Sequence, residues 1–166
     1  MAGKQVSPHN LITRHRSNGV LLDTNLLLLL ALGGLDRKLI GRGRISEFDI
    51  EDFKRLNLVV SSFQSRLTTP NILTEVDDLG RKNVKGRELQ YRGILKKLEL
   101  QMVEKLIPSR TVFADTDDTW LGLADGASLK IDKPFLLLTT DADLWSKANR
   151  FKVDAVNWNH LRMQWL

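Results

Sequence analysis

The chain passes from a strand into a helix at Val20-Leu21-Leu22-Asp23-Thr24-Asn25, which is followed by the apolar run 26–32. An aliphatic segment that ends in helix-capping residues predicts a buried parallel strand leading into a helix. The helix is apolar on all sides, so we expect it to be buried. Open α/β sheets bind ligands at the carboxyl edge of such strands, which makes Asp23 the first candidate site residue. A lone acid at this position can equally be a helix cap.

The same alternation of strands and helices continues along the chain. The apolar run 135–139 predicts a buried strand, 66–69 and 153–156 are expected to be short strands, and 111–113 is expected to be a further strand or a loop. Apolar residues at helical spacing predict helices at 49–63, 70–80, 85–106, 123–129 and 144–149, and around His160. Gly80 is expected to close the helix that Pro70 opens. Together these elements predict an α/β fold with a central, mostly parallel sheet.

Segments without such patterns are expected to be irregular. Residues 1–19 are polar and predict a flexible N-terminal arm, so the domain is expected to span 20–166. Residues 33–44 are rich in Gly and Arg and predict a flexible basic loop. Asp117 and Asp118 are expected to be turn and capping residues.

The composition limits the classes of function. A net charge of +5 over 166 residues favours a polyanionic partner and one domain. The absence of cysteine excludes disulfides and thiolate metal sites, and the three histidines show no zinc-ligand spacing. No signal peptide is apparent, and the apolar run 26–32 is too short to cross a bilayer. We therefore expect a cytoplasmic protein that does not contact a membrane.

Four acids occupy comparable positions in the pattern of elements. Asp23 and Asp141 each follow an apolar strand, Glu75 lies near the apolar stripe of the helix that Pro70 opens, and Asp125 begins a helix. Carboxylates beside buried surface are unfavourable unless they are paired or bind a cation. Four of them at one sheet edge, without histidine or cysteine, describe an all-oxygen site suited to Mg²⁺ or Mn²⁺.

Four segments that contain these acids resemble the four acidic motifs of PIN domains, in the same order. They are Leu21-Leu22-Asp23-Thr24-Asn25, Thr69-Pro70-Asn71-Ile72-Leu73-Thr74-Glu75-Val76, Leu123-Ala124-Asp125-Gly126-Ala127-Ser128-Leu129 and Leu138-Thr139-Thr140-Asp141-Ala142-Asp143-Leu144. The resemblance covers about residues 20–158. It implies a three-layer PIN-like sandwich and, as in most members, a metal-dependent endoribonuclease that hydrolyses phosphodiester bonds in single-stranded RNA.

The resemblance also implies roles for individual residues. The four catalytic acids fall on Asp23, Glu75, Asp125 and Asp141. Metal ligation falls on Asp23, Asp125 and Asp141, with Asp143 as an alternative because both Asp141 and Asp143 fit the strand end. Asn25 and Thr139 match polar positions that line the site. In such a site Asp23 would be the central ligand, and Glu75 would hold the metal through water or orient the nucleophile.

Two departures from compact PIN toxins concern the substrate and the partner. The 33–63 region is an elaboration between the first two acids, and the N-terminal arm is extra. A toxin held by a cognate antitoxin or another regulatory protein is one role that the resemblance permits, as is a homodimer. RNA processing and defence against foreign nucleic acid are others.

Basic residues between 81 and 97 are the best candidates for phosphate contacts, although a solvated helix face is an equal explanation. The set consists of Arg81, Lys82, Lys85, Arg87, Arg92, Lys96 and Lys97, against Glu88 alone.

Two other functions are compatible with parts of the pattern. A haloacid-dehalogenase phosphatase also begins with a strand and an Asp, but it needs a second Asp two positions on, where this chain has Asn25. A catalytically silent PIN scaffold that binds RNA or protein is the alternative from a different class. Metal-dependent cleavage of RNA by the purified protein separates the enzyme from the scaffold.

Overall fold

The computed structural model describes residues 6–114 and 121–165 and has a five-stranded sheet at its centre. The strands are β1 (Val20–Leu22), β2 (Arg66–Thr68), β3 (Val103–Glu104), β4 (Leu136–Thr139) and β5 (Ala155–Asn157). Their order in the sheet is β3-β2-β1-β4-β5, and every pair of neighbours is parallel. The predicted α/β fold with a central parallel sheet is thereby confirmed.

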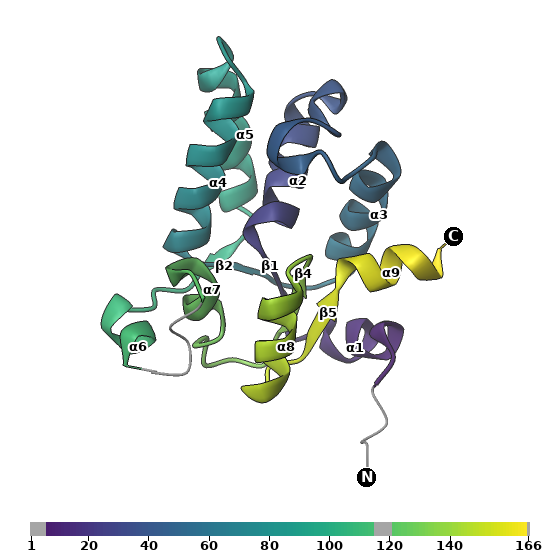
Figure 1. The fold of residues 1–166 in the computed structure, drawn as a ribbon, viewed down its shortest axis with the longest axis vertical. Coiled ribbons are helices and arrows are strands. Elements are labelled where there is room, and N and C mark those ends of the chain that lie inside the picture. Colours follow the sequence, from purple (N-terminus) through teal and green to yellow (C-terminus); the bar gives the residue numbers. More distant parts are fainter. Residues whose placement is uncertain (1–5, 115–120, 166) are drawn as a thin grey trace.

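Helices lie on both sides of the sheet, as expected for a three-layer sandwich (Figure 1). The first half of the chain contains α1 (Pro8–His15), α2 (Thr24–Leu35), the 3₁₀ turns η1 (Arg37–Leu39) and η2 (Gly43–Ile45), α3 (Ile50–Ser61), α4 (Pro70–Asn83) and α5 (Glu88–Glu99). The second half contains α6 (Ser109–Phe113), α7 (Leu123–Ser128), α8 (Ala142–Arg150) and α9 (Trp158–Gln164). In Figure 1, α2 to α5 stand above the strands, and α1, α6 and α8 lie below them.

The strand order reverses direction between β1 and β4. The chain builds β1, β2 and β3 outward in one direction, then returns to place β4 on the other side of β1. The helix after β1 and the helix after β4 leave on opposite sides of the sheet (Figure 1). Ligands of open α/β sheets bind at such a point of reversal, outside the carboxyl ends of the strands. Leu22 is paired with Leu138 here, so Asp23 and Asp141 both lie just beyond this edge.

The apolar helix after β1 is buried, as the sequence predicts. Residues 26–32 of α2 are all buried, because α3, α4 and α5 surround this helix. Gly33 permits the contact between α2 and α3, since a Cβ atom there would lie 2.4 Å from Cδ2 of Phe53 on α3. The helix continues through this glycine to Leu35, so the expected basic loop begins later than 33.

Part of the predicted N-terminal arm is helical, whereas its first five residues lie outside those that the structure describes. Residues 8–15 form α1. Ser7 caps this helix, because its Oγ accepts a hydrogen bond from the Asn10 amide at 3.3 Å. Leu11 and Ile12 are buried against the core, and His15 Nε2 lies 2.7 Å from Asp154 Oδ2. The sequence did not predict this helix, because its three buried residues, Leu11, Ile12 and His15, are too few to give a clear helical period.

Two further predictions between 80 and 113 were wrong. The expected helix 85–106 ends at Glu99, and the two-residue edge strand β3 follows it. Both β3 residues are exposed, so they lack the apolar alternation that reveals a strand. Segment 111–113, expected to be a strand or loop, belongs to α6.

Gly80 does not end α4, which continues to Asn83. It is there because the hydroxyl of Tyr91 on α5 packs against it, and a Cβ atom would lie 1.9 Å from that Oη. No helix within the described ranges is long and apolar enough to span a membrane. The predicted turn residues Asp117 and Asp118 lie outside the residues that the structure describes.

Candidate active site

Asp23 is the most tightly held acid at the carboxyl edge of the sheet. Its Oδ1 accepts the Leu26 amide at 2.9 Å, which caps α2. Its Oδ2 accepts the Thr139 hydroxyl at 2.5 Å and the Thr140 amide at 2.9 Å, both from the end of β4. With only 6% of its surface exposed, Asp23 has a pKa above the ordinary value because of burial, although these hydrogen bonds oppose the shift. The carboxylate is therefore fixed in orientation by the first turn of α2 and by the end of β4.

The end of β4 connects Asp23 to Asp141. Thr139 Oγ1 donates to Asp23 and accepts the Asp141 amide at 2.9 Å. Asp141 caps α8 through one oxygen only, because Oδ1 accepts both the Asp143 amide at 2.7 Å and the Leu144 amide at 3.0 Å. Thr139, predicted from sequence to line the site, thus joins the two strand-end acids directly.

Glu75 is tied to the same edge through a residue that the sequence analysis did not single out. The Thr24 hydroxyl donates to Glu75 Oε2 at 2.7 Å, and Thr24 follows Asp23 directly in the chain. Glu75 lies in the second turn of α4, which Pro70 opens and the Thr69 hydroxyl caps. This bond places one carboxyl oxygen of α4 beside the first turn of α2.

Asp125, on α7, is the fourth acid of the cluster that also contains Asp23, Glu75 and Asp141. This helix packs against α4 and α6, and Val112 touches it so closely at Gly126 that a Cβ atom there would lie 2.5 Å from Val112 Cγ1. Burial raises the pKa of Asp125 to about 7, with further increases from the negative charges of Asp23, Asp141 and Glu75. The carboxylates of the other three predicted acids are therefore all near enough to Asp125 for their charges to act on it.

The charge of this cluster is not balanced within the described part of the chain. No Lys or Arg in the described part of the chain forms an ion pair with any of the four acids. As the side chains stand, no three His, Asp or Glu residues of 6–114 and 121–165 form a ready metal cage. The donors are nevertheless all oxygen atoms, and a divalent cation would favour the ionised form of Asp125, whose pKa is raised by burial first and by the neighbouring negative charges second.

Asp143 and Asn25 differ in their relation to the cluster. Asp143 is exposed in the first turn of α8, and its charge is not among those that raise the pKa of Asp125. Of the two aspartates after β4, Asp141 is the one that joins the other three acids. Asn25 is half-buried in the first turn of α2, and its Oδ1 accepts Arg44 Nε at 3.2 Å.

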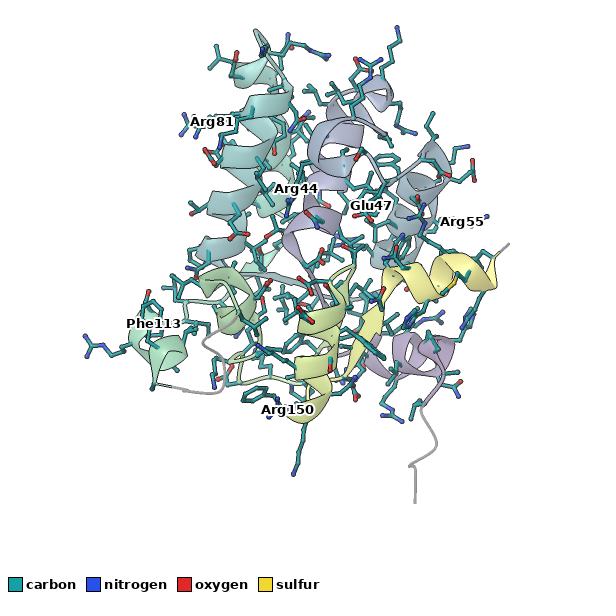
Figure 2. The ribbon with its side chains drawn as sticks, viewed as in Figure 1. Arg44, Glu47, Arg55, Arg81, Phe113 and Arg150 are labelled. Carbon is teal, nitrogen blue, oxygen red and sulfur yellow. The ribbon has the colours of Figure 1, made fainter. Side chains whose placement is uncertain are left out.

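The predicted RNA-binding residues between 81 and 87 have carboxylate partners that the sequence analysis left out. Arg81 pairs with Asp77 and Asp78, and Lys82 also pairs with Asp78. Arg81 lies six residues beyond Glu75 on α4, a rise of about 9 Å, and extends away from the body of the molecule (Figure 2).

The other two members of this set differ from each other. Arg87 pairs with Asp36 at the end of α2, at 2.9 Å, whereas Lys85 is exposed. The set is therefore largely neutralised by neighbouring acids, which weakens its case as a phosphate-binding surface.

Arg44 and Thr24 are the polar residues of this region that sequence reasoning missed. Thr24 had a local signal, because it follows Asp23 in the motif. Arg44 had none, since it lies nineteen residues from Asn25 in a Gly- and Arg-rich segment. A comparison of the sequence with models of protein families found no match, and a search of curated proteins found no significant match.

Proposed function

We propose that the protein is a divalent-metal-dependent endoribonuclease of the PIN type that hydrolyses phosphodiester bonds in single-stranded RNA. The observation that supports it most strongly is the gathering of four acids at the carboxyl edge of β1 and β4, where the charges of Asp23, Asp141 and Glu75 all act on Asp125. The order of the four motifs along the chain and the all-oxygen donor set support the same proposal.

Asp23, Asp125 and Asp141 would hold Mg²⁺ or Mn²⁺, with Glu75 at the side of the cluster. When bound, such ions lower the pKa of water and balance the charge that develops on phosphate and leaving oxygen. The chain's own contribution is orientation. Thr139 and the Thr140 amide fix Asp23, and Thr24 fixes Glu75, so little reorganisation of these acids is needed at the moment of reaction.

The test is cleavage of an end-labelled single-stranded RNA by purified protein with Mg²⁺ or Mn²⁺. We expect cleavage to stop in EDTA and to return when Mn²⁺ is added in excess. Asp141→Asn should lose at least a hundredfold in rate yet remain folded, because asparagine also caps helices and both cap bonds go to a single oxygen. Asp23→Asn should lose as much, although its new amide group faces the Thr140 N–H unfavourably.

The matched control is Asp143→Asn, which removes the same charge two residues away from the cluster. It should retain most of the activity, because Asp143 is not among the acids whose charges act on Asp125. Full activity of both Asp23→Asn and Asp141→Asn, in preparations free of contaminating nuclease, would exclude this site. RNA binding without any metal-dependent cleavage would indicate the silent scaffold instead.

A further inference from the structure

We propose that Arg44 binds the phosphodiester that the acid cluster acts on, so that the segment after α2 supplies the substrate contact. This inference rests on the proposed nuclease function. Four clustered carboxylates repel a polyanion such as RNA, and a cationic side chain at the edge of the cluster would add to the attraction that bound metal ions supply. Arg44 is a cation that contacts a residue of the site itself.

The position of Arg44 is defined by its bond to Asn25. Its Nε donates to Asn25 Oδ1 at 3.2 Å, and Asn25 is two residues beyond Asp23 in the first turn of α2. Arg44 lies over α2, between α4 and α3 (Figure 2). The 3₁₀ turn η2 therefore places Arg44 beside the site, although Arg44 and the four acids belong to different segments of the sequence.

The backbone around Arg44 is anchored on several sides. Ile45 is fully buried and Phe48 is 2% exposed, so both fix the segment to the core. Gly43 has φ +54° and lies against Asn83 of α4, where a Cβ atom would be 2.2 Å from Oδ1. The Glu47 carbonyl accepts Arg162 Nη2 of α9 at 3.0 Å. Because the segment is already ordered, binding a phosphate through Arg44 requires little further loss of backbone entropy.

The terminal nitrogens of Arg44 remain available to a ligand. Arg81, Lys82 and Arg87 are paired with carboxylates, but Arg44 bonds to a neutral amide. That bond uses Nε, and no other residue in the described part of the chain bonds to its Nη1 or Nη2. The exposed guanidinium therefore keeps its full charge and two parallel donors, a geometry that matches two oxygens of a phosphate.

The experiment compares Arg44→Ala with Arg42→Ala, an exposed arginine two residues away that carries the same charge. KM and kcat are measured on a labelled single-stranded RNA with Mn²⁺ at several salt concentrations, and melting curves check folding. A lost charge-assisted contact is expected to raise KM about tenfold or more in Arg44→Ala. The slope of log KM against log salt should flatten by about 0.7. Arg42→Ala should change KM less than about twofold, and Arg44→Lys should recover part of the loss.

A second variant tests the role of Asn25 in holding Arg44. Asn25→Ala removes the acceptor of the Nε bond, so it should also raise KM. If the two residues act together, the double variant should be little worse than Arg44→Ala alone. If instead the increase in KM of the double variant equals the product of the increases in the two single variants, Arg44 is not positioned by Asn25, and that part of the inference is overturned.

The two proposals fail in different ways. A wild-type protein that cuts RNA, with an Arg44→Ala variant of unchanged KM and unchanged salt dependence, overturns the role of Arg44 and leaves the nuclease intact. Equal losses in Arg42→Ala and Arg44→Ala also overturn it, because they show an effect of net charge alone. A wild-type protein that cuts no RNA with any divalent metal overturns both.

Discussion

Asp125 keeps its proton to a higher pH than an ordinary aspartate. Its pKa of about 7 results first from burial and then from the charges of Asp23, Asp141 and Glu75. In the unfolded chain the same carboxyl would ionise near 3.8. The folded protein without a cation therefore becomes less stable as this buried group is forced to ionise, and the charges of the other three acids add to the effect of burial.

The pH dependence of stability follows from the sign of this shift. Because the folded pKa is above the unfolded one, the destabilisation is absent below about 3.8, grows between there and about 7, and is constant above. In EDTA at pH 8, Asp125→Asn should be more stable than wild type by about 1–2 kcal/mol, and the difference should vanish near pH 4. Mn²⁺ should raise the melting temperature of wild type more than that of the variant.

The control for this prediction is Asp132→Asn, which neutralises an exposed aspartate near α7. It should melt as wild type does at both pH values. If Asp125→Asn melts no higher than wild type at pH 8 in EDTA, the four acids do not strain one another.

At the scale of elements, α4 and α5 are held together by one close approach. Tyr91 is fully buried, and its hydroxyl donates to the Val76 carbonyl at 2.6 Å while packing on Gly80. Since α4 also carries Glu75, this contact sets how α4 stands against the sheet edge. The helix that presents an acid to the site is therefore positioned from its far side by an aromatic side chain.

Two glycine substitutions test this contact. Gly80→Ala would place a methyl group 1.9 Å from Tyr91 Oη, so it should destabilise the protein by about 2 kcal/mol or more. Gly93→Ala, in α5 with no atom within 4 Å of its new Cβ, should instead stabilise by about 0.5–1 kcal/mol. Urea unfolding of both variants measures the difference. Equal stabilities would show that α4 and α5 can separate without cost.

Strong local patterns allowed most of the sheet to be predicted. β1 and β4 are apolar runs followed by capping residues, and β2 is a short segment before the Thr69 cap and Pro70, so the sequence is enough to find them. β3 could not be found, because two exposed residues at a sheet edge carry no apolar period. Gly80 was misread because its cause is a residue on another helix.

The acids of the candidate site were predictable and their surroundings were not. Asp23 and Asp141 follow visible strands, so their meeting at one edge follows from parallel pairing. The sequence did not distinguish Asp141 from Asp143. Which of the two carboxylates lies near the other acids depends on how the first turn of α8 is oriented. Arg44 depends on the path of an irregular segment, which no local pattern specifies.

At the scale of the whole molecule, the first helix closes the side of the sheet that β4 and β5 form. α1 packs against these two strands, and His15 and Arg14 both contact Asp154 just before β5. The beginning and the end of the described chain are thus joined through one helix.

Truncating the buried side of α1 should show this contribution. Leu11→Ala with Ile12→Ala is expected to cost about 3 kcal/mol or more, because both side chains are buried against the core. Thr13→Ala, on the exposed side of the same helix, should have no measurable cost. Urea midpoints compare the two. A double variant as stable as wild type would return this segment to the flexible arm that its composition suggests.

The position of β1 between β2 and β4 also has a consequence for translation. Asp23 is made early, but its partner Thr139 is added 116 residues later. At 5–20 residues per second, a ribosome needs roughly 6 to 23 s to cover that interval. Throughout that time the nascent chain lacks Asp141, so the four acids cannot come together until residue 141 has been added.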